Sequence, residues 1–338
     1  MTWQSQLNAD PLPWLLEVEV PGVRYLALRD LLDFPSDHPD LLAARQAAYL
    51  KGPIAALLAA MQSQGYWAEP GAGYHPKYTA TAWSVLMLAQ LGASAVQDER
   101  ITRACAYLLD HALAPGGQFS INGSPSGNID CLQGNLCWAL VTLGCSDARL
   151  EKAFEWMARC VTGDGIAAMD DRQAVVRYYG YKCGPDFACG ANDRLPCAWG
   201  AAKVLLAFNA WPAERRTSLI ESANRRAVDF LFSTDPATAL YPHAARADKP
   251  SANWWKFGFP VFYITDVLQV VEALVGSGQG SDPRLAHAAT LILQKQDSQG
   301  RWLLEYDYHG KTWVDFGPKK QPNPWVTIRA LRVLKALS

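Results

Sequence analysis

Six segments of 12 to 14 residues carry apolar side chains on nearly every turn of a predicted helix. Most begin with a small or aromatic residue and end at glycine or another residue that stops a helix. They cover residues 23–34, 79–92, 131–144, 197–208, 262–275 and 325–338, and their ends lie 52 to 67 residues apart. Helices that are apolar nearly all round are buried on all sides. We therefore expect six buried helices that belong to one repeat.

Amphipathic segments alternate with these buried helices. Apolar residues recur there every three or four positions, and charged residues occupy the opposite face. The segments are 40–61 with a break near Gly52-Pro53, 98–113, 147–161, 213–232 and 282–294, with 2–16 as a candidate sixth. This alternation predicts an all-α fold, an α/α toroid or six-hairpin barrel, with an inner ring of apolar helices and an outer ring of amphipathic ones. No linker divides the chain, so we expect a single domain over residues 1–338.

Composition narrows the classes of function. Hydrophobic residues make up 50% of the 338 and charged residues 19%, which supplies material for a large core. Lys plus Arg number 31 against 32 Asp plus Glu, and a net charge of −1 argues against nucleic-acid binding. No apolar run has the roughly 18 residues of a membrane span, and no signal peptide is evident, so we expect a cytoplasmic protein without a transmembrane segment. Oligomeric state is not predicted.

Glutamine-rich turns that end in glycine and an aromatic residue follow three outer helices. They read QSQGYW at 62–67, GGQF at 116–119 and QDSQGRW at 296–302. These turns resemble the QW-type motif of the prenyltransferase and squalene-cyclase repeat superfamily, and the likeness covers nearly the whole chain. Blocks such as VRYLALRDLL, LPCAWGAAK and WVTIRALRVLK look most like bacterial prenyltransferase-like toroid proteins of uncertain function. The resemblance implies a terpenoid-cyclase-like α/α toroid.

The long connections all lead from an outer helix into the next inner helix. They cover residues 66–78, 114–130, 162–196, 233–261 and 297–324, and they hold Trp, Tyr, His and Cys. Loops of this length in a compact domain are usually functional. The inner helices also point their N-termini, with free N–H groups, toward the same end. We therefore expect the binding cavity at that end of the ring.

Four of the eight cysteines are candidate metal ligands. Cys131 and Cys197 begin consecutive inner helices, and Cys183 and Cys189 lie in the loop that enters the second one. Four thiolates in one place would form a tetrahedral zinc site. Two other interpretations stay open, because free cysteine is a common buried apolar residue and an activated thiol is a nucleophile. The remaining four cysteines are predicted to pack within helices. No nucleotide is expected, because Gly310-Lys311-Thr312 follows Glu305 where a P-loop needs glycine.

Asp266 is the strongest catalytic candidate. It lies near the start of an apolar helix, after a run of aromatic residues, where a carboxyl group would have a raised pKa and could donate a proton. It could equally be a helix-terminal carboxylate that accepts from backbone N–H groups or pairs with Lys256 or Arg329. The other catalytic candidates are His75, His243 and Tyr263. The candidate substrate-binding residues are the aromatics Tyr78, Tyr179, Trp254, Trp255, Trp313 and Trp325.

Three functions remain as hypotheses. The first is an enzyme that acts on an apolar, isoprenoid-like or polycyclic small molecule in an aromatic cavity, by acid/base or carbocation chemistry (cyclisation, isomerisation, hydration or prenyl transfer). The second is a zinc-assisted hydrolase or lyase on the same scaffold. The third is a toroid that binds a hydrophobic ligand or partner without catalysis. A carbohydrate-active toroid would need paired carboxylates, for which Asp170 and Asp171 are the one candidate. They also form only part of the Asp-x-Asp-Asp motif of squalene-type cyclases.

Overall fold

The computed structural model describes the chain except for residues 1, 18, 168–170, 172, 174–181 and 245–248. The described residues form α-helices and short 3-10 turns joined by loops. They contain isolated β-bridges but no strand. The fold is therefore all-α, as the hydrophobic pattern predicts.

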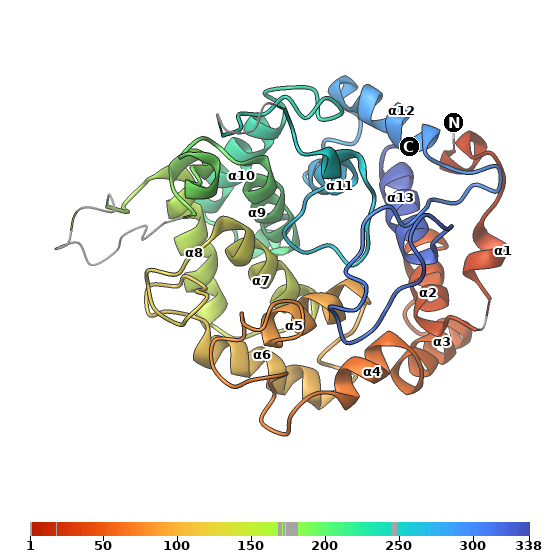
Figure 1. Cartoon of the computed structure of the whole chain (residues 1–338), viewed down its shortest axis with the longest axis horizontal. Coiled ribbons are helices and arrows are strands. Elements are labelled where there is room, and N and C mark those ends of the chain that lie inside the picture. Colours follow the sequence, from red (N-terminus) through yellow and green to blue (C-terminus); the bar gives the residue numbers. More distant parts are fainter. Residues whose placement is uncertain (1, 18, 168–170, 172, 174–181, 245–248) are drawn as a thin grey trace.

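Six helices lie around the centre of the molecule in Figure 1. These inner helices are α2 (Pro21–Leu26), α5 (Thr81–Gln90), α7 (Asp130–Thr142), α9 (Ala198–Ala210), α11 (Val267–Gly276) and α13 (Pro324–Ala336). Successive inner helices contact each other from α5 to α13, and α13 contacts α2. Gly92, which follows α5, lies against Leu26 of α2. Contacts thus link the inner helices in series from α5 through α13 to α2, and the turn after α5 lies near α2.

The amphipathic segments form helices that lie farther from the centre in Figure 1. They are α3 (Pro39–Leu50), α4 (Pro53–Ala59), α6 (Glu99–His111), α8 (Arg149–Thr162), α10 (Ser218–Leu231) and α12 (Ala286–Gln294). The predicted break at Gly52-Pro53 separates α3 from α4. Asp98 caps α6 by accepting a hydrogen bond from the backbone N–H of Arg100. The amphipathic helices lie outside the inner helices because the apolar face of each one is buried against them.

Two predicted segments differ from the structure. Residues 2–16 do not form one helix but a 3-10 turn (Trp3–Gln6) and the short α1 (Leu12–Leu15), since Pro11 and Pro13 each lack a backbone N–H. The segment 262–275 becomes helical only at Val267. Asp266 ends the preceding loop there, and its side chain accepts from the backbone N–H of Gln269 at 2.8 Å.

α7 and α9 approach each other so closely that a side chain is excluded between them. A Cβ atom at Gly134 would lie 2.5 Å from the carbonyl carbon and 2.7 Å from the carbonyl oxygen of Lys203. Backbone atoms cannot move aside as the end of a flexible side chain can. At Gly200, three residues into α9, an added Cβ would meet the Cβ of Asp130 at 3.1 Å, which is a milder contact. Gly134 therefore fixes how near these two inner helices come.

Residues 257–266, called the central segment here, are held by three inner helices. The Gln90 side chain of α5 bonds both backbone groups of Val261, accepting from its N–H at 2.7 Å and donating to its carbonyl at 2.9 Å. Asn135 of α7 donates to the carbonyl of Phe262 at 3.3 Å. Arg329 of α13 donates to the carbonyl of Gly258 at 2.7 Å. Loop backbone is thus satisfied in the interior by side chains from different helices.

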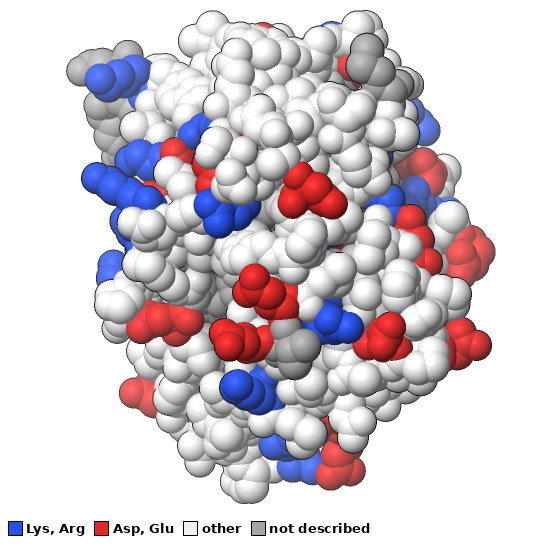
Figure 2. Space-filling view, turned by 90° about the vertical axis from the view of Figure 1, so that its right-hand side faces the viewer, with Lys and Arg blue, Asp and Glu red and all other residues white. Residues whose placement is uncertain are grey.

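The surface shown in Figure 2 carries acidic and basic side chains of both signs, interspersed among uncharged residues. This mixed pattern agrees with the net charge of −1. Among the described residues, no helix is both long enough and apolar enough to cross a membrane.

Replacing Gly134 by alanine should destabilise the fold, because the new methyl group overlaps the backbone of α9. We expect a loss of about 1–3 kcal/mol in the free energy of unfolding, measured by chemical denaturation. Gly200→Ala is the matched control. It should cost under about 1 kcal/mol, because alanine also favours the helix. Equal losses at both positions would show that the approach of α7 to α9 is not the limiting contact.

Candidate functional site

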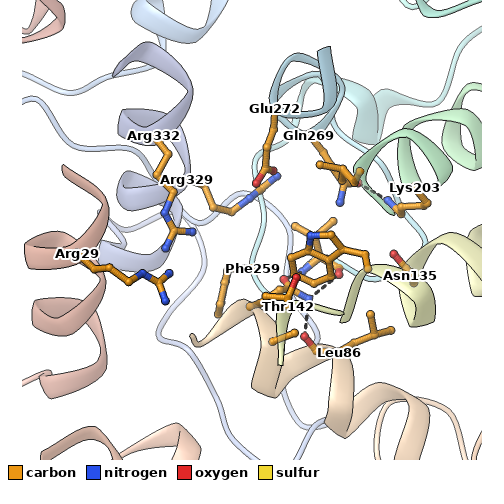
Figure 3. Close-up of a pocket in the computed structure, with 15 residues that line it drawn as sticks. Arg29, Leu86, Asn135, Thr142, Lys203, Phe259, Gln269, Glu272, Arg329 and Arg332 are labelled. Atoms are coloured by element: carbon orange, nitrogen blue, oxygen red, sulfur yellow. Dashed lines mark hydrogen bonds between the residues drawn. The ribbon is translucent and has the colours of Figure 1, made fainter. Parts of the chain in front are cut away.

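A cavity of about 110 Å³ lies among the inner helices, and charged and polar side chains converge on it (Figure 3). All six inner helices contribute, α2 through its π-helical continuation (Ala27–Leu31). The charged lining residues are Arg29, Lys203, Glu272, Arg329 and Arg332. The neutral polar ones are Gln90, Asn135, Thr142 and Gln269, and the remaining wall is apolar, with Leu86, Ala89, Trp138, Leu206, Phe259 and Val261. We refer to it as the central cavity.

Two of the arginines share one carboxylate behind the cavity wall. Arg29 contacts Asp30 at 2.5 Å, and Arg332 of α13 also pairs with Asp30. Burial disfavours the charge of Asp30, but Arg332 and Arg29 outweigh it and hold its pKa below the usual value. The Nε of Arg332 is buried and has no hydrogen-bond partner among the described residues. Asp30 therefore orients two guanidinium groups while neutralising one of their charges.

Arg329 is held by an ion pair of its own. Its Nη1 and Nη2 atoms lie 2.9 and 3.0 Å from the two carboxylate oxygens of Asp266. The two side chains are 6% and 5% exposed, so the pair is buried. A two-point contact between a guanidinium and a carboxylate fixes the orientation of both groups. Arg329 is thereby positioned at the cavity with its charge compensated.

Lys203 is the cation without such compensation. Its side chain is fully buried on α9, and its ammonium group donates to Thr265 Oγ1 at 2.7 Å and to Gln269 Oε1. Both acceptors are neutral, and no carboxylate oxygen of the described residues lies within ion-pair distance. Burial lowers the pKa of Lys203 to about 8. The group can therefore gain or lose a proton near neutral pH.

Glu272 of α11 is the carboxyl group of the cavity. Its pKa is raised above the usual value because it is buried, although the nearby charges of Arg329 and Arg332 act in the opposite direction. Among the described residues its side chain has no hydrogen-bond partner. Such a carboxyl group holds its proton to higher pH than a solvent-exposed glutamate does. Two groups with shifted pKa values thus line the same cavity.

The charges around the central cavity sum to a positive value. Four cations line it, and Glu272, Asp30 and Asp266 supply three negative charges, so the sum is 4 − 3 = +1 when all are ionised. An excess of positive charge around a cavity favours a bound anion. The planar, multiply donating guanidinium groups suit carboxylates and phosphates.

Asp266 matches one of the two interpretations that the sequence left open. It caps α11 through the N–H of Gln269 and pairs with Arg329, so both of its oxygens are engaged by Arg329. Asp266 is therefore a carboxylate at the start of a helix that accepts from a backbone N–H and pairs with Arg329.

Aromatic side chains pack against one another in a cluster at the N-terminal ends of α5 and α11. Tyr78 packs against Tyr308 with ring centroids 4.6 Å apart and stacks on Phe262 at 5.7 Å. Trp83 contacts Tyr263 at 5.2 Å, and burial raises the pKa of Tyr263 well above its usual value. The candidates Tyr78 and Tyr263 thus belong to one packed cluster. They are not among the residues that line the central cavity.

The other tryptophan candidates are spread over the molecule. Trp325 stacks on Phe259 with centroids 5.2 Å apart and is buried. Trp255 donates from its indole to the carbonyl of Ala237 at 2.7 Å. Trp313 is 39% exposed and donates to the carbonyl of Thr79 at 2.8 Å. The structure therefore does not bring the aromatic candidates among the described residues together around one cavity.

A second pocket of about 300 Å³ lies beside the start of α9, and we call it the side pocket. Four of the sequence candidates line it: Cys189, Cys197, His243 and Trp254. Trp199 and Tyr241 add aromatic wall. This pocket lies at the end of the inner helices where the sequence places the binding cavity. His75 is exposed and packs edge-on against Tyr74, whereas Tyr179 and Asp170 lie outside the described residues.

The four candidate metal-ligating cysteines divide into two neighbourhoods. Cys197 donates a hydrogen bond to Cys189, which is the main reason that the pKa of Cys189 is lowered to about 6. Cys183 lies instead beside Cys160 of α8 and Asp130 of α7. Burial raises the pKa of Cys131 to about 12. Cys160, which the sequence assigns to helix packing, is therefore in contact with one of the candidates.

Comparisons with known proteins add little to this picture. No family model matches the sequence, and no curated protein matches it. Among solved structures, the chain is similar to a variant of the type II terpene cyclase MstE from Scytonema in its apo form, at 16% identity and a TM-score of 0.33. The match covers 84% of this chain and 93% of that chain. A likeness at this level carries no information about ligand or reaction.

Sequence reasoning named Arg329 only as a partner of Asp266 and missed the other charged residues of the central cavity, although a signal for two of them is present. Lys203 and Glu272 are the charged residues of largely apolar runs, CAWGAAKVLLAF and VLQVVEALV. Charged residues are rarely buried without a partner or a role. In a circuit of buried helices, the isolated polar residue of each helix is the one to place at the centre.

Replacing Arg329 by methionine should be strongly destabilising, because Asp266 would remain as an unpaired buried carboxylate. We expect a loss of about 3–5 kcal/mol in the free energy of unfolding, measured by denaturation at pH 7. The double variant Arg329→Met/Asp266→Asn should recover part of this loss, since asparagine still caps a helix. A double variant no more stable than Arg329→Met would contradict the role given to the ion pair.

Proposed function

We propose that the chain is an α/α toroid whose central cavity binds a small anionic molecule and transfers a proton to it. The contacts between successive inner helices and the alternation of apolar and amphipathic segments support the toroid. The observation that carries the function is the convergence of Lys203, Arg329 and Arg332 with Glu272 in one interior cavity. Pairs of buried titratable groups with shifted pKa values are typical of active sites.

The charged residues divide naturally into two roles. Lys203 and the arginines would hold a carboxylate or phosphate of the substrate, because each presents N–H donors to the cavity. Glu272, whose pKa is raised by burial, would be the group that donates a proton to the bound molecule. The apolar wall formed by Trp138, Leu206 and Phe259 would strengthen these interactions by limiting water.

This ligand class differs from the apolar molecule expected from the sequence. Burying an apolar molecule against Lys203, Arg332 and Glu272 would remove water from charged groups without replacing its hydrogen bonds, which is unfavourable. A polar, anionic ligand supplies acceptors for the same donors. The acid/base part of the expected chemistry is retained, and the isoprenoid-like substrate is not assigned to the central cavity.

Anion binding should depend on the charge of Lys203. Malonate keeps a constant charge between pH 7 and 9, whereas Lys203, with a pKa of about 8, is mostly charged at the lower pH and mostly neutral at the higher. Isothermal titration calorimetry should therefore show the affinity of the wild-type protein for malonate falling roughly tenfold over that range. Lys203→Met should weaken binding at least tenfold at pH 7 and remove the pH dependence.

Two further variants control this experiment. Lys311→Met removes an exposed lysine outside the cavity and should leave malonate affinity unchanged. Glu272→Gln removes the carboxyl group of the cavity and should bind malonate at least as tightly as the wild type. Affinity that is equal in the wild type and Lys203→Met would refute the proposed anion site.

The side pocket supports a second candidate function, the binding of an apolar small molecule. Trp199, Tyr241 and Trp254 line it, and its volume of about 300 Å³ suits a larger ligand than the central cavity does. Apolar pockets with a few polar groups are the usual form of small-molecule sites. Here His243 and Cys189 supply those groups.

Binding of the uncharged dye Nile red, followed by its fluorescence, tests the side pocket. Trp199→Ala should weaken the dye's affinity several-fold, because Trp199 supplies part of the aromatic wall. Trp313→Ala, which removes an exposed tryptophan outside both pockets, is the control and should have no effect. Loss of dye binding in both variants, or in neither, would count against a ligand in the side pocket.

A further inference from the structure

A carboxyl group and two thiols meet where three elements of the chain converge. Asp130 opens α7, Cys160 lies in the last turns of α8, and Cys183 lies in the loop that follows. One ligand atom from each residue lies within 4.8 Å of the other two. The loop is fixed there by backbone contacts, since the N–H of Asp130 donates to the carbonyl of Lys182 at 3.2 Å.

These three groups are buried, and the carboxyl group is incompletely satisfied. Asp130 is 4% exposed, Cys160 is 1% exposed and Cys183 is fully buried. One oxygen of Asp130 lies 3.9 Å from the sulfur of Cys160, while Oδ2 has no hydrogen-bond partner among the described residues. No ion pair to Asp130 is found within the described part of the chain. A buried carboxyl group with an unpaired oxygen requires a proton or a cation to compensate it.

The chemistry of the donors selects the cation. Two thiolates and a carboxylate are ligands that Zn²⁺ accepts at about 2.0–2.3 Å in a tetrahedral arrangement, and the thiolates disfavour Mg²⁺ and Ca²⁺. Ligand atoms already within 4.8 Å of one another need only a small contraction to reach those distances.

We propose that Asp130, Cys160 and Cys183 bind a zinc ion. This ion would link the loop that contains Cys183 to the start of α7 and the end of α8. The site uses one of the four cysteines singled out in the sequence, Cys183, together with two residues that the sequence analysis did not select as ligands. The inference is independent of the central cavity.

The metal content of the purified protein tests this site directly. Full-length protein without a histidine tag, purified in reducing buffer without chelator, should contain about one zinc per chain by mass spectrometric elemental analysis. Cobalt-substituted protein should show the thiolate-to-cobalt charge-transfer absorption that cysteine ligands produce. Cys160→Ser and Asp130→Asn should each lower the bound zinc at least tenfold after dialysis against a competing chelator.

Cys137→Ser is the matched control, because Cys137 is a buried thiol on α7 outside the group. It should retain the zinc content of the wild type. Folded wild-type protein with less than a tenth of an equivalent of zinc would overturn the proposal. So would zinc that persists in both ligand variants, or non-reducing peptide mapping that finds Cys160 and Cys183 joined to each other by a disulfide. If the variants do not fold, the wild-type zinc content and the cobalt spectrum decide.

Discussion

The buried ion pair between Arg329 and Asp266 connects the parts of the structure on which the candidate site depends. From α13, Arg329 contacts both oxygens of Asp266 at the start of α11 and also bonds the carbonyl of Gly258. Desolvating two charges is unfavourable, so such a pair persists only when its hydrogen bonds are complete. Here they tie two inner helices to the central segment. The Arg329–Asp266 contact thereby holds both the wall of the central cavity and Arg329, one of its cations, in place.

The central cavity follows from how polar residues are distributed over the inner helices. The helices α5, α7, α9, α11 and α13 are largely apolar, and each contributes one or two polar residues to the wall of the cavity. Asp266 pairs with Arg329 and Asp30 is shared by Arg29 and Arg332, whereas Lys203 has only neutral acceptors. The site therefore keeps a net positive charge when all of its groups are ionised. This arrangement explains why the cavity suits an anion even though the surrounding helices are hydrophobic.

Much of the fold could be predicted from the sequence, because helix periodicity and helix-ending residues are local. The break at Gly52-Pro53 and the helices that became α5, α7, α9 and α13 were predicted closely. The late start of α11 could not be foreseen from apolar character alone, since it depends on Asp266 acting as a cap and meeting Arg329 from 63 residues away. Trp254 lines the side pocket, but other aromatic residues predicted to line a cavity, such as Tyr78 and Trp325, pack against other aromatic side chains. Whether Tyr78 faces a ligand or Phe262 is decided by tertiary contacts that composition does not encode.

The cysteines show the same limit. Matching positions at the starts of two helices grouped Cys131 with Cys197, and the loop position added Cys183 and Cys189. In the structure Cys189 and Cys197 line the side pocket, whereas the contact between Cys183 and Cys160 joins a loop to the end of an outer helix. Repeat spacing describes the inner helices and not the paths of long loops.

Crystallography after a bromide soak would show whether the central cavity binds anions. Anomalous difference density locates bromide independently of any assumed substrate. If the central cavity binds anions, a strong peak should appear there within contact of Lys203 and Arg332. Bromide found at surface arginines while the central cavity holds water alone would contradict the proposed anion site.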